Sequence, residues 1–404
     1  MSNIIKNNFQ IKFKQLCESE AIKWFYRIIF VLLVFSQIFF GATTATWTSP
    51  FSQFAQWWIN FVRHYAVYIV IVLCLFMKKF TVRELKWYMG LLVFFTLFTH
   101  VRFFRWESIY FLTVAMLIKD EDDEWLSKTL FWLFLSTFIL ILGLTYFDVI
   151  ESIIRYRPDG FPRISLGFQH PNRTGAMVLT IFITYLLKRK ENPSLIILAS
   201  FVPIFMILNT WIDSRTGLLI IMAMFVFIIL AKIVEKKCSE FNFLSKYKKL
   251  YIWFLPSFFL IASYLLSLIY THENSVLNLL NRLFSGRLVL GRTFVEDYPV
   301  TLFGVDVYMN ARNPQSVALN GFRFLDNGFL VSLLTLGLIL TILRLVYFSW
   351  LAHNMVVRRY KYALVIFTAV MFFGFMENLV WSATWNTMFL YGGIFLKQSE
   401  KMNA

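Results

Sequence analysis

Apolar runs recur along the whole chain and are separated by polar stretches. Backbone groups in lipid must form hydrogen bonds within their own segment, so each run is predicted to be a helix. Many contain roughly 17–25 residues, which suits a hydrocarbon core about 30 Å thick. The pattern predicts an all-α polytopic membrane protein with about 12 transmembrane helices, of which those at 87–100, 106–118, 173–187 and 383–396 are short enough to be re-entrant. The predicted spans are 24–41, 61–77, 87–100, 106–118, 129–147, 173–187, 194–211, 216–234, 250–270, 327–350, 362–378 and 383–396.

The lysines orient these helices. With the N-terminus placed inside and the helices alternating, every lysine falls on the inner side, whereas one missed helix would put lysines on both sides. The basic N-terminal stretch precedes an apolar run that no clear cleavage site follows, so we interpret this run as a retained helix. Both termini are therefore expected in the cytoplasm.

The arginines do not follow the distribution of the lysines. Cationic residues in outer loops run against the positive-inside pattern, so something must favour them there. Guanidinium groups bind phosphate and carboxylate through two parallel hydrogen bonds and stay charged when partly buried. Some could pair with outer acids such as Glu151, Asp159, Glu296 and Asp297, but an anionic ligand explains the set better. Thirteen of nineteen arginines lie outside or at outer helix ends: Arg63, Arg102, Arg105, Arg155, Arg157, Arg163, Arg173, Arg215, Arg282, Arg287, Arg292, Arg312 and Arg323.

Composition agrees with a single membrane domain over residues 1–404. The chain is 58% hydrophobic and 15% charged, against about 25% charged in soluble domains. The net charge of +16 does not indicate nucleic-acid binding, because the basic residues lie between hydrophobic spans. Cys17, Cys74 and Cys238 lie far apart in sequence, so we expect no disulfide, no metal centre and no cofactor.

Two predicted outer loops are long, at 148–172 and 271–326. In the second, five apolar residues fall on one face at 3.6 residues per turn, which predicts an amphipathic helix. Arg287 falls in the middle of that face, where an unpaired charge is costly, and is therefore a functional candidate. The five apolar residues are Val276, Leu280, Leu283, Leu290 and Phe294.

Three polar motifs open predicted helices at the outer side. They are His170-Pro171-Asn172-Arg173 with Gly175, Ser214-Arg215-Thr216-Gly217, and Asp326-Asn327-Gly328. Each has the chemistry of an ordinary helix cap, and each also suits anion binding at a helix N-terminus. Asp326, close to Arg323, is a candidate general base. The acidic run 120–124 lies in an inner loop, and we interpret it as a solvated loop rather than a cation site.

Together these motifs resemble the O-antigen ligase and polymerase family of bacterial membrane proteins. The resemblance covers roughly residues 160–345 and includes Ser285-Gly286-Arg287, then Pro299 and Leu302-Phe303-Gly304-Val305, and Gly337 after Asp326-Asn327. It implies a dozen or so helices, a large outer loop and a polyprenyl-diphosphate-linked oligosaccharide as glycosyl donor. Ligases of the family usually carry His-Asn where this chain has Asp326-Asn327, which favours a polymerase.

The resemblance implies a polymerase in the bacterial cytoplasmic membrane that builds a capsule, exopolysaccharide or O-antigen by inverting glycosyl transfer. A flippase and a chain-length regulator are its implied partners. In our hypothesis Arg215 and Arg287 bind the diphosphate, and Arg163 or Arg173 assists. Asp326 or His170 is the base. Further substrate-binding candidates are Asn172, Arg292, Arg323 and Asn327.

Two alternatives remain open at this point. A ligase of the same family would differ in its acceptor. A flippase or exporter of a lipid-linked glycan would need charges along the interior of the helical bundle. Few charges fall within or near the ends of the predicted spans, mainly Arg63, Glu107, Arg344 and Glu377, and this favours the enzyme.

Overall fold

The protein is mostly helical. The computed structural model describes residues 19–47, 49–98, 102–157, 160–190, 193–237, 243–307 and 324–396. Within these ranges seven helices are long and apolar enough to cross a membrane: Glu20–Ala42, Ser52–Met77, Asp123–Tyr146, Leu195–Ile212, Arg215–Ile233, Lys248–Ile269 and Gly328–Val357. Shorter apolar helices are Trp106–Ile118, Ala363–Met376 and Thr387–Leu396. The all-helical membrane architecture is thus confirmed, and the count of twelve spans stays a prediction.

The helices follow the predicted apolar runs closely. In the first half they are α2 (Glu20–Ala42), α3 (Ser52–Phe61), the π-helix η2 (Val62–Ala66), α4 (Val67–Met77), α5 (Val82–Phe98), α6 (Arg102–Ile118) and α7 (Asp123–Tyr146). Then come α8 (Pro171–Lys188), α9 (Leu195–Ile212), α10 (Arg215–Lys237), α11 (Phe243–Ile269), α12 (Ser275–Leu283) and α13 (Arg287–Asp297). The last are α15 (Gly328–Val331), the π-helix η4 (Ser332–Leu336), α16 (Gly337–Val357) and α17 (Ala363–Met376). Short 3-10 turns are η1 (Thr44–Thr46), η5 (Asn378–Trp381) and η6 (Thr387–Tyr391).

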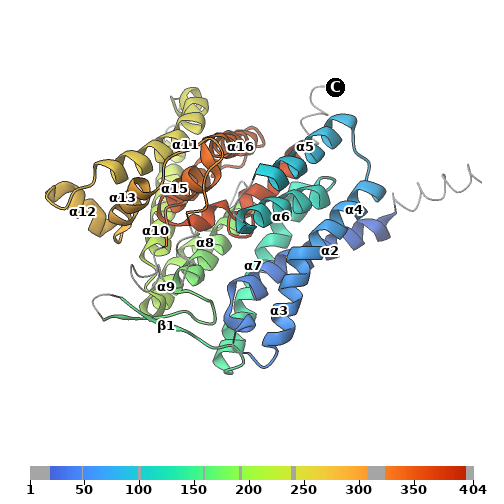
Figure 1. The fold of residues 1–404 in the computed structure, drawn as a ribbon, viewed down its shortest axis with the longest axis horizontal. Coiled ribbons are helices and arrows are strands. Elements are labelled where there is room, and N and C mark those ends of the chain that lie inside the picture. The colour runs from blue at the N-terminus through green and yellow to red at the C-terminus, as the bar shows by residue number, and fades with distance from the viewer. Residues whose placement is uncertain are drawn as a thin grey trace, which may run out of the picture.

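The bundle has two sides. Figure 1 shows α2 to α7 gathered on one side and α9 to α13 on the other. Helix α8 joins them, because it packs against α7 on one side and against α9 and α10 on the other. Helix α17 packs against α10 and α11. Nearly every side chain of α8 after its first turn is buried, including polar Thr180 and Thr184, which bond to carbonyls one turn back. A buried central helix holds whatever lies at its first turn in a fixed position.

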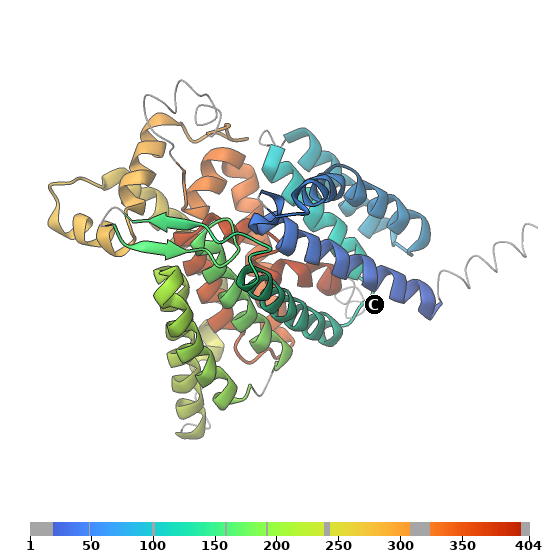
Figure 2. The same cartoon turned by 90° about the horizontal axis from the view of Figure 1, so that it is seen from below.

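The loop at 148–172 is an ordered hairpin. Strands β1 (Ile154–Tyr156) and β2 (Pro162–Ile164) are antiparallel and lie at one end of α9 (Figures 1 and 2). The chain after β2 bonds to the end of α2, where Gln169 N donates to the carbonyl of Ala42 at 3.0 Å. The hairpin thereby connects the two sides of the bundle and places its residues beside the first turn of α8.

The predicted amphipathic helix in the loop at 271–326 is divided into two helices, α12 and α13. Ser285 and Gly286 both adopt positive φ, at 54° and 82°, so a single helix cannot pass through them. The Asn281 side chain accepts from the backbone N–H groups of Leu288 and Val289 at 3.0 and 3.1 Å, which fixes the start of α13. Arg287 is consequently the first residue of a helix and not the middle of one.

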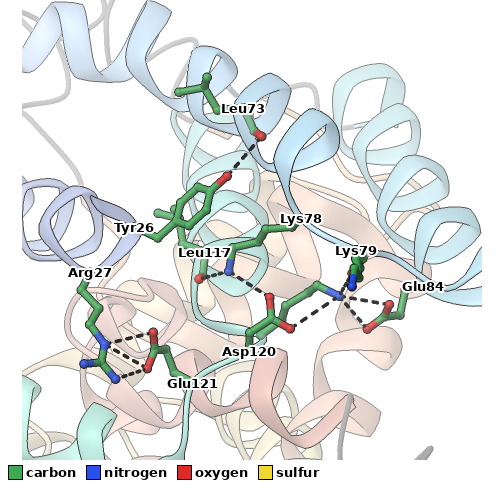
Figure 3. A network of polar contacts seen from close by, with 10 residues as sticks. Tyr26, Arg27, Leu73, Lys78, Lys79, Glu84, Leu117, Asp120 and Glu121 are labelled. Carbon is green, nitrogen blue, oxygen red and sulfur yellow. Dashed lines mark hydrogen bonds and ion pairs between the residues drawn. The ribbon is translucent and has the colours of Figure 1, made fainter. Parts of the chain in front are cut away.

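The acidic run 120–124 is solvated only in part, because Asp120, Asp122 and Glu124 are exposed whereas Glu121 is buried. Glu121 forms an ion pair with Arg27 at 2.7 Å, and Asp120 pairs with Lys78 at 3.2 Å (Figure 3). Beside them Lys119, only 2% exposed, lies 3.2 Å from the Glu84 carboxylate. We call these residues the Lys119 network: Arg27, Lys78, Glu84, Lys119, Asp120 and Glu121. They join the ends of α2, α4, α5 and α6.

Candidate functional site

Arg287 is buried at the start of α13 and makes three contacts with protein acceptors. Its Nη2 donates to Oε1 of Glu377 at 2.6 Å, and its Nη1 donates to the carbonyl of Phe284 at 3.1 Å. Its Nε donates to the carbonyl of Met376. A buried guanidinium needs such partners, and here they fix the orientation of the planar group.

A second guanidinium reaches the same carboxylate through an amide. Glu377 Oε1 also accepts from Nδ2 of Asn172, in the first turn of α8, at 2.9 Å. The Asn172 oxygen in turn accepts from Arg163 on β2, whose Nε also donates to the carbonyl of Ile212 at 3.2 Å. Burial and the nearby Arg157 lower the pKa of Arg163 to about 10, so it remains cationic at neutral pH. The chain Arg287–Glu377–Asn172–Arg163 thus links three distant parts of the sequence.

The hairpin adds a third positive charge. In the register of the two strands Arg155 lies directly opposite Arg163. Like charges in a cross-strand pair are destabilising. The register therefore pairs two cationic positions on the hairpin, and an anionic ligand there would offset their repulsion.

His170 caps α8 and stays neutral. Its Nδ1 accepts a hydrogen bond from the backbone N–H of Asn172 at 3.1 Å. Burial, followed by the positive charges of Arg163, Arg155 and others, lowers its pKa to about 4. A neutral imidazole that accepts at Nδ1 carries its proton on Nε2, so its free nitrogen is a donor and not a base.

Asp326 is the better candidate for a base. Its Oδ2 lies 3.9 Å from Nη2 of Arg287, and its side chain is 34% exposed. Burial raises the pKa of Asp326 above its ordinary value, while Arg287 and Arg163 oppose this shift. A half-buried carboxylate with a raised pKa, facing a fixed guanidinium, suits proton abstraction. We call this set the Arg287 cluster: Arg155, Arg163, His170, Asn172, Arg287, Asp326 and Glu377.

Three helix N-termini meet at the cluster. Asn172 lies in the first turn of α8, Arg287 begins α13, and Asp326 directly precedes the cap Asn327 of the long helix from Gly328. Free N–H groups and the helix dipole make such ends attractive to anions. With three guanidinium groups and two carboxylates, the cluster carries an excess of positive charge.

The glycines of the sequence motifs have steric roles. A side chain on Gly175 would place Cβ 2.0 Å from Oγ of Ser214, so this glycine lets α8 approach the start of α10. Gly304 and Gly337 both have positive φ, and a Cβ on Gly337 would lie 2.3 Å from the nitrogen of Gly304. The Leu302–Val305 motif is thereby packed on the π-helix η4, next to the helix that Asn327 caps.

Several predicted residues lie outside the cluster. Arg215 is exposed and pairs with Asp213 at 3.3 Å, and Asp213 also pairs with Arg157. Arg292 pairs with Glu296 at 2.6 Å, and the Asn327 side chain caps its helix and donates to Ser263 at 3.1 Å. Arg173 points to a different pocket, where its Nη1 donates to the carbonyl of Gly41 at 3.2 Å. Arg323 lies outside the described residues.

Sequence reasoning missed two members of the cluster. Glu377 was noted as a charge near a helix end, but its position after the apolar stretch 363–376 gave no hint of a partner almost 90 residues earlier. Arg155 was one of thirteen outer arginines, and only the strand register distinguishes it. Within the described part of the chain, no group of three or more His, Cys, Asp or Glu residues is placed to hold a metal ion.

The fold and the cluster define a helical membrane protein with a buried, cationic, hydrogen-bonded centre. The chain matches no protein-family model, no curated protein and no solved structure.

Proposed function

We propose that this protein polymerises polyprenyl-diphosphate-linked oligosaccharide repeat units into a surface polysaccharide. The observation that carries this proposal is the Arg287 cluster, in which the buried Arg287 and the hairpin's Arg163 both act on the half-buried carboxylate of Asp326. The finer topology is part of the proposal: about twelve spans, both termini in the cytoplasm, and the cluster at the outer face of a bacterial cytoplasmic membrane.

The chemistry needs a fixed positive field at the leaving group. In a single displacement the acceptor hydroxyl oxygen bonds to the anomeric carbon as the bond from that carbon to the diphosphate oxygen breaks. The diphosphate leaves with the electron pair, and the anomeric configuration inverts. Arg155, Arg163 and Arg287 stabilise the charge that grows on this oxygen, and their positions are set before the reaction begins.

The proton of the acceptor hydroxyl goes to Asp326. Burial raises its pKa, which makes it a stronger base than an exposed aspartate. Glu377 is less suited, because its Oε1 already accepts from both Arg287 and Asn172. We assign Glu377 the role of positioning Arg287, and His170 that of donating a hydrogen bond from Nε2 to a substrate oxygen.

Transport of a lipid-linked glycan is the second candidate. The observation in its favour is that Arg63, Glu107 and Arg173 line one cavity within the bundle, although the sequence predicts few charges inside the spans. The cavity lies beside the Arg287 cluster and does not by itself make a path across the membrane.

Lipid-linked intermediates distinguish the candidates. A cell that lacks the protein would be complemented with wild type, with Arg287→Ala, or with Arg282→Ala as an exposed control from α12. If the protein is a polymerase, cells without it, or with Arg287→Ala, should accumulate single lipid-linked repeat units on the outer leaflet and make no long polymer. Wild type and Arg282→Ala should restore the long polymer. Long polymer left on its lipid carrier would indicate a ligase instead, and repeat units trapped on the inner leaflet would indicate a transporter.

A further inference from the structure

A second polar cavity lies on the other side of the first turn of α8. Its volume is about 420 Å³, within the range of roughly 300–1,000 Å³ for ligand pockets. Asn172 and Arg173 are consecutive, yet Asn172 bonds to Glu377 in the Arg287 cluster while Arg173 lines this cavity. The two sites therefore share a wall. We call this pocket the Glu107 cavity.

Three residues that line this cavity each carry a buried polar atom with no hydrogen-bond partner in the described part of the chain. Gln37 is 6% exposed, and its Nε2 has no hydrogen bond among the described residues. The same holds for Oε2 of Glu107, which is 8% exposed, and for Nε of Arg63. All three residues line the cavity. Such atoms are rare in native proteins and each is destabilising, so they point to a polar occupant.

The backbone around Arg63 is specialised as well. Arg63 lies in the π-helix η2, and such segments occur frequently at functional sites. Its guanidinium stacks on the ring of Trp106 at 5.1 Å. Gly41 leaves space for the neighbouring Gln37, because a Cβ there would lie 3.1 Å from Oε1 of that side chain.

The pattern of donors and acceptors selects the occupant. Gln37 and Arg63 offer unused donors, and Glu107 offers an unused acceptor, so the ligand must both accept and donate. A phosphodiester or a fully ionised diphosphate would meet the Glu107 carboxylate with no proton to give, whereas sugar hydroxyls both donate and accept. Trp47 and Trp385 also line the cavity and supply aromatic faces on which a sugar ring can stack.

We propose that the Glu107 cavity binds a sugar ring of the acceptor glycan, while the Arg287 cluster binds the diphosphate of the donor. This inference rests on the proposed function and names the place of its second substrate. The shared wall brings the acceptor hydroxyl to the anomeric carbon of the donor. It also gives Arg63 and Glu107, two of the charged residues inside the predicted spans, a role that needs no path across the bilayer.

Two probes test the two sites separately. The purified protein in lipid nanodiscs would be titrated with farnesyl diphosphate, and with the free oligosaccharide released from the repeat unit by mild acid. Binding would be followed by native mass spectrometry. Gln37→Leu and Glu107→Gln should weaken oligosaccharide binding about ten-fold and change farnesyl diphosphate binding less than two-fold. Arg287→Ala should weaken farnesyl diphosphate binding about ten-fold and change oligosaccharide binding less than two-fold. Gln53→Leu, an exposed position on α3, is the matched control.

Each outcome has one meaning. Oligosaccharide that does not bind wild type, or that binds the cavity variants as well as wild type, overturns the inference, since water alone would then occupy the cavity. Selective loss in the cavity variants supports it. If that loss is seen but cells without the protein still make normal polymer, the proposed function fails and the sugar site stands.

Discussion

The Lys119 network and the Arg287 cluster use the same residue types in different ways. In the network the ion pairs join each basic residue to an acidic one, and Arg27, Lys78 and Lys119 each have a carboxylate within 3.2 Å. In the cluster Arg287 is also closely paired, with Glu377 at 2.6 Å, but Arg155 lies opposite Arg163 in the strand register and Asp326 stands 3.9 Å from Arg287. Closely paired charges hold helices together, whereas an excess of one charge is the mark of a binding site.

The largest effect is expected at Asp326, whose carboxylate lies 3.9 Å from Arg287. Asp326→Asn removes the base while keeping the size of the side chain, so the rate of polyprenyl diphosphate release should fall by about 10²–10⁴-fold. The rate would be measured with reconstituted protein and purified lipid-linked repeat units. Asp148→Asn, at an exposed position of the hairpin loop, is the control and should leave the rate unchanged.

The pH profile of the same reaction sharpens this assignment. Burial raises the pKa of Asp326, so the rate should rise with pH through a midpoint above about 3.9, the ordinary value for aspartate. Arg163 lowers this pKa, so Arg163→Gln should move the midpoint to higher pH. A profile that Arg163→Gln leaves unmoved would exclude Asp326 as the titrating base.

The next largest effect is expected from a double variant that separates substrate binding from protein stability in the Arg287 cluster. The double variant Arg287→Met with Glu377→Gln removes both charges and keeps an oxygen for Asn172. It should unfold at nearly the wild-type temperature, because removal of both partners leaves no unpaired buried charge. Its reaction rate should still fall by about 10²–10³-fold, since the donor to the leaving group is lost. Normal activity of this folded variant would place the cluster outside the chemistry.

The matched change in the network should affect stability alone. Lys119→Met leaves the Glu84 carboxylate buried and unpaired, which should lower the free energy of unfolding by about 3–5 kcal/mol. Adding Glu84→Gln should recover most of that loss and keep the hydrogen bond from the Thr81 N–H. Thermal unfolding in detergent measures both, and the rate per folded molecule should match wild type. A rate defect in the folded double variant would show that the network also serves the chemistry.

The smallest effect concerns His170. Its pKa of about 4 in the folded protein lies below the unfolded value of about 6.5, so its stabilising effect is complete above pH 6.5 and is lost as pH falls toward 4. The loss should reach at most about 3 kcal/mol at pH 4. His170→Asn keeps a capping side chain without titration, so its unfolding temperature should vary less over this range than that of wild type. Equal pH dependence would contradict the assignment.

The sequence predicted helices well because apolar length alone determines them in a membrane. It also placed Asn172, Arg163, Arg287 and Asp326 among the candidates, since each lies at a predicted helix start or outer loop. It singled out Arg287 but placed it in the middle of one amphipathic helix, whereas Ser285 and Gly286 divide that helix and Arg287 begins α13. Glu377 escaped assignment because its partners come from α8 and α13, and contacts between distant helices leave no local pattern.

Reconstitution of the purified protein, alone in nanodiscs with a purified lipid-linked repeat unit, tests the central claim most directly. The account predicts that wild type makes a ladder of longer glycans and releases an equal amount of polyprenyl diphosphate, one molecule for each unit added. The Arg287→Met, Glu377→Gln double variant should produce neither the ladder nor the release. Repeat units that wild type leaves unchanged, or a ladder of equal length from the double variant, would contradict it.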